Sequence, residues 1–338
     1  MKCISLFSGA GGLDVGAEAA GVQIIRAVEF DRDAAETLRI NSNGIARIES
    51  EDICDLSFTE HHSEGNNLIV IGGPPCQPFS KNGYWVKNVN RLIERDPRNM
   101  LSQFLRVVKE VEPRGFLFEN VESLRHPTNL ETFNAFVSTA ESLGYYCTVF
   151  LANSADFGVP QKRKRVFIFG VKGGNKAIPE PLRTHSADPS TNLPPHRGVG
   201  TFIKPYGGVS FFEPTETVTG GTYENELKHV PPGNNYIALG KLKGYSGRTF
   251  RPGGRFWNFL YKLHPDQPSI TIAAQPGPWV GPFHWDNRRL RVPEIAALQT
   301  FPKNYRFHGS RRSIQKQIGN AVPCLLGAAM VRHLLEHI

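Results

Sequence analysis

The stretch Lys2–Gly16, "KCISLFSGAGGLDVG", predicts how the fold begins. Its apolar start is typical of a buried strand, and its glycine-rich middle predicts a tight turn into the helix-like segment that follows. Glycines at a strand-to-helix turn let backbone N–H groups approach a ligand at the helix N-terminus. The GxGxxG pattern of dinucleotide sites is incomplete here, because Asp14 stands at the third glycine position. The stretch therefore fits either a nucleoside-binding loop or an ordinary tight turn.

The alternation of strand and helix signals continues to about residue 172. Further strand-like segments are "VQIIRAVEFD", "LIVIGG", "GFLFENV" and "RVFIFGV". The helix-like segments between them are "LDVGAEAAG", "RDAAETLRIN", "MLSQFLRVVKEV" and "LETFNAFVSTAESLG". Strands that alternate with helices predict an α/β fold with a parallel sheet covered on both faces.

Beyond residue 172 the sequence becomes rich in Gly, Pro, Thr and aromatic residues and loses its periodicity. Helical patterning returns in "VPEIAALQTF" and in "CLLGAAMVRHLLEHI". We therefore predict a large domain over 1–172, a small loop-rich domain over 173–285, a connecting segment over 286–312, and a return to the large domain over 313–338.

Composition limits the class of protein. The 338 residues carry a formal net charge of +8, which fits a solvated surface and an acidic partner such as nucleic acid about equally well. The five cysteines form no CxxC pair, which argues against a zinc site and a disulfide framework. Cys54 and Cys147 lie in apolar patterns, so we expect them to be buried. With no basic-then-apolar leader and no apolar run of about 18 residues, we expect a cytoplasmic protein without a membrane segment.

Two acidic residues follow strand-like segments. Glu29 ends the second such segment, and Asp52 follows the next apolar one. The carboxyl ends of parallel strands share one edge of the sheet, where these carboxylates could meet ribose hydroxyls and an adenine amino group. Each residue alone is more often a helix cap or a loop end. Together with the glycine turn, they predict a nucleoside pocket.

The segment that begins at Gly72, "GGPPCQPFS", presents the thiol of Cys76 among three prolines. Such a loop can continue neither a strand nor a helix. Rigid presentation suits a nucleophile, because a misplaced attacking atom loses most of its proximity advantage. No histidine is near Cys76 in sequence, so a Cys–His hydrolase would need His185 or His264 to fold back.

This segment resembles the catalytic loop of the DNA cytosine-5 methyltransferase family, of the bacterial restriction-modification type. "LFSGAGGLDVG" is similar to that family's S-adenosylmethionine loop, "FENV" to its acid motif and "QKRKRVFIFG" to its basic motif. "RRLRVPEIAALQTFP" resembles the segment that organises target recognition, and "QIGNAVP" the closing motif. The resemblance spans nearly the whole chain. It implies a Rossmann-like class I S-adenosylmethionine-dependent methyltransferase fold, with a catalytic and cofactor-binding large domain and a small target-recognition domain.

The resemblance assigns catalytic roles to Cys76, Glu119, Arg163 and Arg165. Cytosine C5 is a poor nucleophile, but a thiolate that adds at C6 turns C5 into an enamine-like carbon that attacks a methyl sulfonium. Glu119 would stabilise the charge that develops at N3, although a strand-end acid paired with an arginine is the simpler alternative. Arg163 and Arg165 would share one face of an extended segment, with Lys162 and Lys164 on the other.

The cofactor implied by the resemblance is S-adenosylmethionine, and no metal is expected. The residues assigned to its pocket are Phe7, Gly9, Gly11, Glu29, Phe30, Asp52, Ile53, Pro75, Leu101, Asn320 and Val322. Because the last two come from the far end of the chain, the C-terminal helix would have to pack beside the first strand.

The implied substrate is a cytosine in double-stranded DNA, which must leave the base stack to reach the site. Gln77, Ser80 and Arg98 are predicted to contact the DNA. The polar segment Ser80–Asn99 fits a loop that closes over DNA, or equally a plain surface loop. We expect a prokaryotic modification enzyme, a monomer with one recognition sequence. A cognate restriction endonuclease or other defence component would act separately.

Three alternatives stay open. The first is a tRNA-directed relative with the same core chemistry, although that group's "CFT" segment is not in the sequence. The second is an RNA methyltransferase with two catalytic cysteines, which the other four cysteines do not fit. The third is a non-catalytic DNA- or cofactor-binding homologue, against which the intact set of catalytic residues argues.

Overall fold

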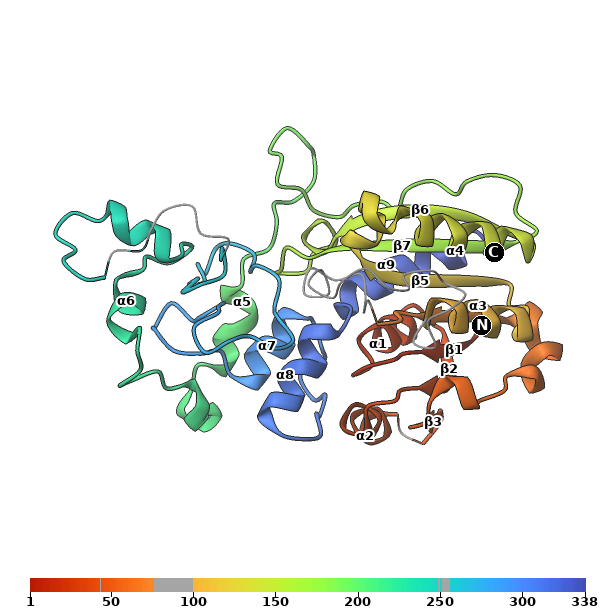
Figure 1. Cartoon of the computed structure of the whole chain (residues 1–338), viewed down its shortest axis with the longest axis horizontal. Helices are drawn as coiled ribbons and strands as arrows, with labels where there is room; N and C mark the ends of the chain where they lie inside the picture. Colours follow the sequence, from red (N-terminus) through yellow and green to blue (C-terminus); the bar gives the residue numbers. More distant parts are fainter. Residues whose placement is uncertain (43, 76–99, 249, 251–255) are drawn as a thin grey trace.

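Within the described part of the chain, seven strands form one sheet in the order β3-β2-β1-β4-β5-β7-β6 (Figure 1). The computed structural model describes residues 1–338 apart from 43, 76–99, 249 and 251–255. The strands are β1 (Lys2–Leu6), β2 (Gln23–Val28), β3 (Arg47–Glu49), β4 (Leu68–Gly72), β5 (Gly115–Val121), β6 (Tyr145–Asn153) and β7 (Lys164–Lys172).

The strand β4 shows how the sequence builds the core. All five of its residues are buried, and β-branched apolar side chains favour the pleated conformation. Successive side chains point to opposite faces. Leu68 and Val70 therefore enter the hydrophobic core on one side of the sheet, and Ile69 and Ile71 enter the core on the other.

Helices cover both faces of the sheet. The helices that pack on it are α1 (Gly12–Ala19), α2 (Arg32–Asn41), α3 (Met100–Val111), α4 (Leu130–Ser142) and α9 (Cys324–Leu335). The helices α3 and α4 share one core with the sheet, and α1, α2 and α9 share the other (Figure 1). In α3 the buried residues Leu101, Phe104, Leu105 and Val108 have the i, i+3, i+4, i+7 spacing of an amphipathic helix. The predicted α/β fold is confirmed.

One feature of the sheet differs from the fully parallel prediction. The strand β7 pairs antiparallel with both β5 and β6, whereas the pairs among the other described strands are parallel. The connection from β6 to β7 contains only a short turn of 3-10 helix, Ser154–Phe157. A parallel return needs a crossover of about a dozen residues or more, usually a helix, so this short link produces a hairpin.

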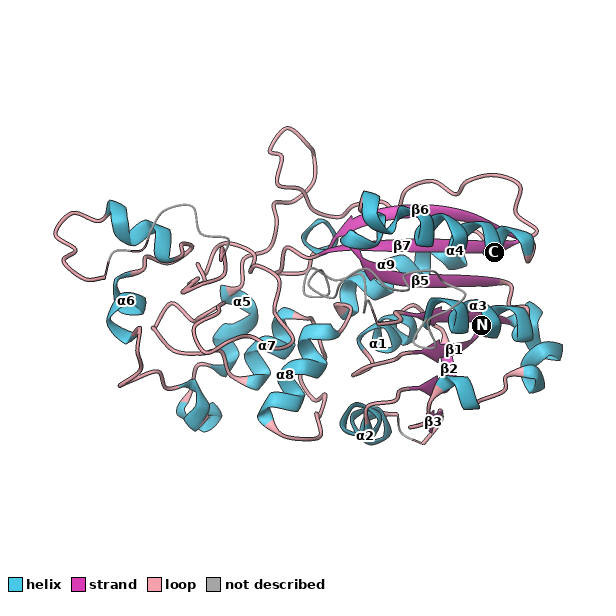
Figure 2. Ribbon diagram, in the orientation of Figure 1, coloured by secondary structure: helices cyan, strands magenta, loops and turns pink. Residues whose placement is uncertain are grey.

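Residues 173–285, predicted above as a small domain, consist mainly of loops (Figure 2). Its described helices are α5 (Gly200–Ile203) and α6 (Glu224–His229), and α7 (Val292–Leu298) and α8 (Arg311–Asn320) follow it in the chain. Aromatic rings form its own core: Tyr223 and Tyr236 each make edge contacts with Phe259. This core explains how a stretch without periodicity still folds.

The C-terminal helix α9 packs against α1 and the sheet. Gly16 of α1 allows the close approach, because a Cβ there would lie 2.6 Å from the backbone nitrogen of Ala328 in α9. The stretch Arg311–Leu335 is long and apolar enough to be compared with a membrane span. It consists of two separate helices, however, and 72% of its most apolar window is buried inside the protein.

Candidate active site

Glu119 lies near the carboxyl end of β5, where it is 8% exposed. Its Oε1 is 3.0 Å from Nε of Arg165, which stands on the neighbouring strand β7. Burial raises the pKa of Glu119 above its ordinary value, while the positive charges of Arg165 and Arg163 pull that pKa back. The structure therefore brings three of the four predicted catalytic residues together around a buried carboxyl group.

The turn that leads to Cys76 packs against this carboxyl group. A Cβ built on Gly73 would lie 2.7 Å from Oε2 of Glu119, so glycine leaves the room that the carboxyl group occupies. The next residue of β5, Asn120, donates from Nδ2 to the carbonyl of Pro74 at 3.2 Å. The β5 end thus holds the first part of the predicted catalytic loop. Four predicted site residues lie outside the described part of the chain: Cys76, Gln77, Ser80 and Arg98.

Arg163 binds the C-terminal end of α8. Its Nη1 donates to the carbonyl of Gly319 at 2.9 Å, and its Nη2 donates to the carbonyl of Asn320 at 3.1 Å. The last carbonyls of a helix lack partners within the helix and carry partial negative charge, so a guanidinium suits them. Lys162 and Lys164 are exposed, as the alternation along this segment predicts. Arg163 therefore connects the basic motif to the closing motif.

The glycine turn after β1 has a left-handed backbone at Phe7, Gly9 and Gly11, with φ of 55°, 57° and 79°. The N–H of Gly9 donates to Oε2 of Glu29 at 2.8 Å, and the N–H of Asp31 donates to Oε1 at 2.7 Å. Each carboxylate oxygen keeps a further lone pair for a ligand hydroxyl. Glu29 thus lies at the turn, as predicted, and also fixes its backbone.

The remaining residues assigned to the cofactor differ in exposure. The side chain of Phe30 is 71% exposed, whereas Ile53 and Leu101 are buried. Asp52 begins a short turn, in which its Oδ1 accepts from the N–H of Cys54 at 3.0 Å. Pro75 is exposed at the end of the described part of the loop.

The closing motif packs on the start of α1. A Cβ built on Gly12 would lie 2.3 Å from the carbonyl oxygen of Val322, so these backbones are in direct contact. Val322 therefore lies beside Gly12, directly after the glycine turn, although the two are about 310 residues apart in sequence, and Asn320 is two residues before Val322.

These residues fit S-adenosylmethionine. The carboxylates of Glu29 and Asp52 can accept from the hydroxyl and amino groups of an adenosine. The exposed ring of Phe30 offers an apolar face for a purine, and the glycine turn offers backbone without bulky side chains.

Two buried glutamines are not among the predicted site residues. Gln161 and Gln299 are both fully buried, and Nε2 of Gln161 donates to Oε1 of Gln299 at 2.9 Å. The available signal was their place inside the quoted motifs, because a glutamine in an apolar setting needs buried partners. Asn120 was missed in the same way inside "FENV".

The expectation that Cys54 and Cys147 are buried is only half right. Cys147 in β6 is partly buried, but Cys54 is exposed. Cys54 lies in the short turn that Asp52 caps, and such a turn sits on the surface rather than in the core.

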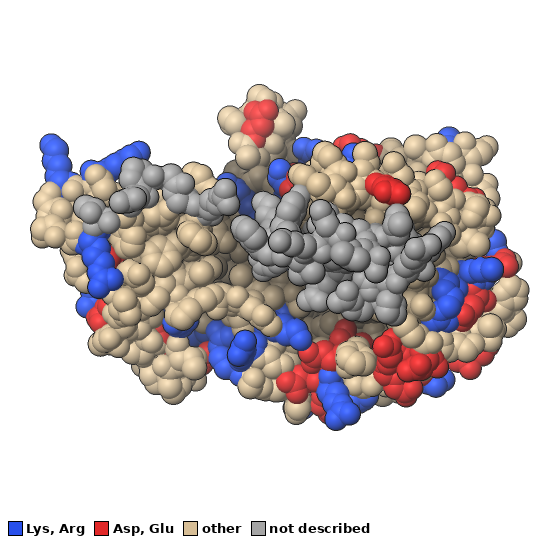
Figure 3. Space-filling view, in the orientation of Figure 1, with Lys and Arg blue, Asp and Glu red and all other residues tan. Residues whose placement is uncertain are grey.

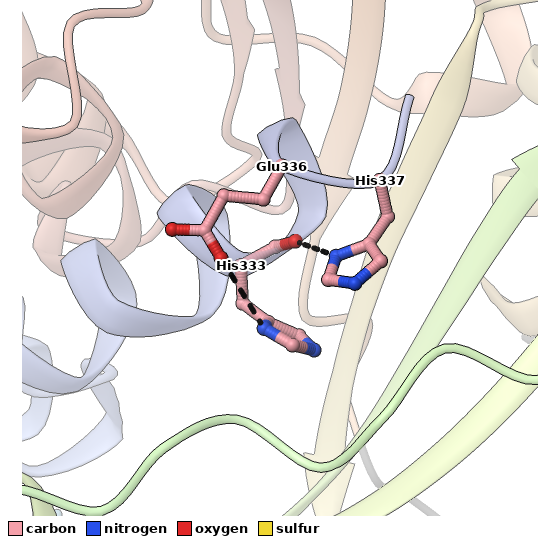
Figure 4. A group of neighbouring side chains, drawn as sticks. All are labelled: His333, Glu336 and His337. Atoms are coloured by element: carbon pink, nitrogen blue, oxygen red, sulfur yellow. Dashed lines mark hydrogen bonds and ion pairs between the residues drawn. The ribbon is translucent and has the colours of Figure 1, made fainter.

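A separate cluster lies at the end of α9, where ligand atoms of His333, Glu336 and His337 are all within 4.8 Å of one another (Figure 4). His333 Nε2 is 2.8 Å from the carbonyl of Pro179, and His337 Nδ1 is 2.8 Å from the carbonyl of His333. These bonds satisfy a helix end and tie it to the chain that leaves β7. The cluster is therefore accounted for as a helix terminus.

A cavity of about 560 Å³ lies in the small domain, between the α5 region and the segment 284–288. It is lined by Lys204, Trp285 and Arg288 among others, none of them a predicted site residue. Arg288 is engaged by both carboxylate oxygens of Glu294 at 2.8 Å and 2.7 Å.

A doubly wound sheet with a glycine turn, a strand-end acid and an arginine pair defines a Rossmann-like methyltransferase class. Residues 1–336 match the model of the family described as C-5 cytosine-specific DNA methylase, and the chain belongs to that family. The chain is 36% identical to Type II methyltransferase M.SacI of Streptomyces achromogenes, over 100% of this chain and 93% of that protein. It is 32% identical to Type II methyltransferase M1.HphI of Haemophilus parahaemolyticus, over 98% of this chain and 86% of that protein.

Solved structures agree on the fold. A putative DNA modification methyltransferase encoded within an E. coli prophage superimposes with a TM-score of 0.68 at 25% identity, over 99% of both chains. The Dnmt2 methyltransferase of S. pombe superimposes with a TM-score of 0.69 at 17% identity, over 99% of this chain and 98% of that one.

Proposed function

We propose that this DNA cytosine-5 methyltransferase transfers a methyl group from S-adenosylmethionine to a cytosine flipped out of duplex DNA, through a covalent bond to Cys76. One observation carries the proposal. The buried carboxyl group of Glu119 packs against Gly73, three residues before Cys76 in the sequence, and lies 3.0 Å from Arg165.

Each residue has a role that follows from its chemistry. The thiolate of Cys76 adds to C6, which breaks the aromaticity of the base and makes C5 nucleophilic. Negative charge develops at N3 and O2, where protonated Glu119 donates to N3 and the guanidinium of Arg165 stabilises O2. When bound, S-adenosylmethionine supplies an electrophilic methyl group to C5. Loss of the C5 proton then restores the double bond as the sulfur of Cys76 leaves C6.

Charge supports binding of DNA by the second half of the chain. Residues 1–172 contain 19 Lys and Arg against 21 Asp and Glu, whereas residues 173–338 contain 20 against 10. Figure 3 displays basic side chains around α7 and α8 and acidic ones over the α2 side of the large domain. A cationic surface binds the phosphate backbone, while side chains in the small domain would read base edges.

A role in restriction-modification is the biological setting that we propose. Three relatives that are 36%, 32% and 31% identical to this chain are named as Type II methyltransferases. In that setting the enzyme would act as a monomer on its own DNA sequence, while a separate endonuclease cuts the unmethylated sequence.

The test is methyl transfer from tritiated S-adenosylmethionine to duplex DNA, with tRNA as the competing substrate. The wild type should label duplex DNA and leave tRNA unlabelled, and Cys76→Ala should label neither. Label in tRNA alone would support the tRNA-directed alternative. Label in DNA that survives Cys76→Ala would reject the covalent mechanism. No transfer at all would support the non-catalytic alternative.

A further inference from the structure

Residues 269–274, in the part of the chain predicted as the small domain, lie against residues 160–162, which come directly before Arg163. We call this extended segment the docking strand, although it contains only one isolated bridge. Gln161 and Ser269 form a parallel bridge. The N–H of Lys162 donates to the carbonyl of Ser269 at 2.7 Å, and the N–H of Ser269 donates to the carbonyl of Pro160 at 2.9 Å. The small domain is thereby attached to the segment that carries Arg163.

The amide of Gln161 joins the docking strand to Gln299. Its Oε1 accepts from the N–H of Ile272 at 3.1 Å, and its Nε2 donates to Oε1 of Gln299 at 2.9 Å. Both glutamines are fully buried. A buried amide that loses a partner costs about 1–3 kcal/mol, so this pair has little freedom to rearrange one member at a time.

Gln299 in turn binds the last turn of α8. Its Nε2 donates to the carbonyls of Ile318 at 2.6 Å and Ala321 at 3.2 Å. Arg163 takes the two carbonyls between them, at Gly319 and Asn320. One glutamine and one arginine therefore hold four successive carbonyls, those of residues 318–321. Gln299 is linked to the docking strand through Gln161, and Arg163 directly follows Lys162, whose N–H binds the docking strand.

The docking strand also touches this turn directly. A Cβ built on Gly319 would lie 2.5 Å from Cα of Ala274, so the two backbones are in contact. After the turn, the carbonyl of Val322 packs on Gly12 at the glycine turn. Closely packed interiors transmit displacements instead of absorbing them. A shift of the docking strand must therefore reach the cofactor residues Asn320 and Val322.

We propose that Gln161 and Gln299 are positioning residues that couple recognition of the target DNA to affinity for the methyl donor. The inference rests on the proposed function, since it needs DNA at the small domain and S-adenosylmethionine at the glycine turn. Cognate DNA, which fixes the docking strand, orders the Ile318–Ala321 turn through the two amides. Coupling of this kind is typically 5- to 150-fold in affinity and is reciprocal between the two ligands.

The experiment is calorimetric titration of the full-length protein with S-adenosylhomocysteine. It is run without DNA, with a duplex that carries the recognition sequence mapped in expressing cells, and with a scrambled duplex. We expect cognate DNA to tighten S-adenosylhomocysteine binding by about tenfold or more in the wild type. Scrambled DNA should change it by less than about threefold. S-adenosylhomocysteine should tighten binding of cognate DNA by the same factor.

Two variants separate coupling from simple stability. Gln161→Ala removes the bonds of this amide to both Ile272 and Gln299. Gln161→Glu keeps an acceptor for the N–H of Ile272 but removes the donor to Gln299. Both should reduce the cognate factor to less than about threefold while binding of S-adenosylhomocysteine without DNA stays within threefold of wild type. If Gln161→Ala does not fold, Gln161→Met, which keeps the volume without burying a charge, carries the test.

The matched control is Gln315→Ala. Gln315 Nε2 donates to the carbonyl of Ala273 at 2.8 Å, so this variant loses a bond to the docking strand that involves neither Gln161 nor Gln299. It should keep the wild-type factor.

The proposed function fails on its own terms if the wild type neither binds S-adenosylhomocysteine nor methylates DNA. The coupling fails if an active wild type gains no affinity from cognate DNA. It fails equally if the Gln161 variants lose thermal stability but retain the full factor.

Discussion

Arg165 and Glu119 form an ion pair across β7 and β5, with Nε and Oε1 3.0 Å apart and both side chains largely buried. The pair sets two opposing influences on the acid. Burial favours the protonated carboxyl group, and the guanidinium favours the carboxylate. The proposed reaction at cytosine N3 needs a proton donor that can recover its proton, and this balance would supply one.

Arg165→Ala should raise the pKa of Glu119, because it removes the cation that opposes burial. Only the protonated acid donates to N3, so activity falls as pH rises through that pKa. The alkaline limb of the rate profile should therefore move to higher pH, while the rate falls about 10²-fold for lack of charge stabilisation at O2. Single-turnover rates against pH measure both effects. Lys164→Ala, an exposed neighbour, should leave the limb in place, and a limb that moves to lower pH would contradict the assignment.

Asn120→Ala should loosen the backbone two residues before the predicted nucleophile Cys76, because Nδ2 of Asn120 holds the carbonyl of Pro74. We expect kcat to fall about 10- to 100-fold, since a misplaced nucleophile loses much of its proximity advantage. Affinity for S-adenosylhomocysteine should change little. Steady-state kinetics and calorimetry together check this, and a loss confined to cofactor affinity would be the wrong result. Asn129→Ala, which breaks a bond to the carbonyl of Ser123 away from the loop, is the control.

Asp14→Asn should stabilise the protein at high pH. Asp14 is buried, accepts from Oγ of Ser5 at 2.5 Å, and has its pKa raised to about 7 by burial. A pKa raised on folding adds stability below the ordinary value of 3.8, and that stability is lost as pH rises to about 7. The variant should therefore exceed the wild type in free energy of unfolding at pH 8 and approach it near pH 4.

Urea unfolding at both pH values measures the difference. The exposed Asp266→Asn should show no such trend. An Asp14→Asn variant that is equally destabilised at pH 4 and pH 8 would mean that its hydrogen bonds outweigh the cost of burying its charge.

Glu49→Gln should destabilise the large domain by about 3–5 kcal/mol, because it breaks a buried ion pair. Arg26 contacts Glu49 through Nε at 2.6 Å and Nη2 at 3.2 Å, and its guanidinium lies 4.0 Å from the ring centre of Phe58. Glu60→Gln removes an exposed partner of the same arginine and should cost about 0–1 kcal/mol. Denaturant midpoints compare the two. Equal effects would contradict the role of burial.

Local patterns in the sequence predicted the elements that depend on them. The run "LIVIG" was enough to predict β4, and "MLSQFLRVVKEV" was enough to predict α3, because side-chain periodicity fixes each element on its own. The direction of β7 was not predictable in that way. It depends on the length of the link from β6, and no periodicity within β7 encodes it.

The same distinction between local patterns and contacts of distant segments applies to the site. The place of Glu29 followed from its position at a strand end, but its bond to the N–H of Gly9 depends on the fold of the turn. Arg163 was predicted from its motif, yet its partners Gly319 and Asn320 come from the other end of the chain. Contacts between such distant segments are set by packing, which a pattern in one segment does not contain.

The central claim is a covalent bond between the sulfur of Cys76 and C6 of the target cytosine. The most direct measurement uses a duplex with 5-fluorocytosine at the methylated position, where fluorine cannot leave as a proton does. With S-adenosylmethionine present, the wild type should form a denaturation-resistant adduct of protein and DNA, mapped by mass spectrometry to the peptide that contains Cys76. An active wild type that forms no adduct, or forms it through another residue, would contradict the account.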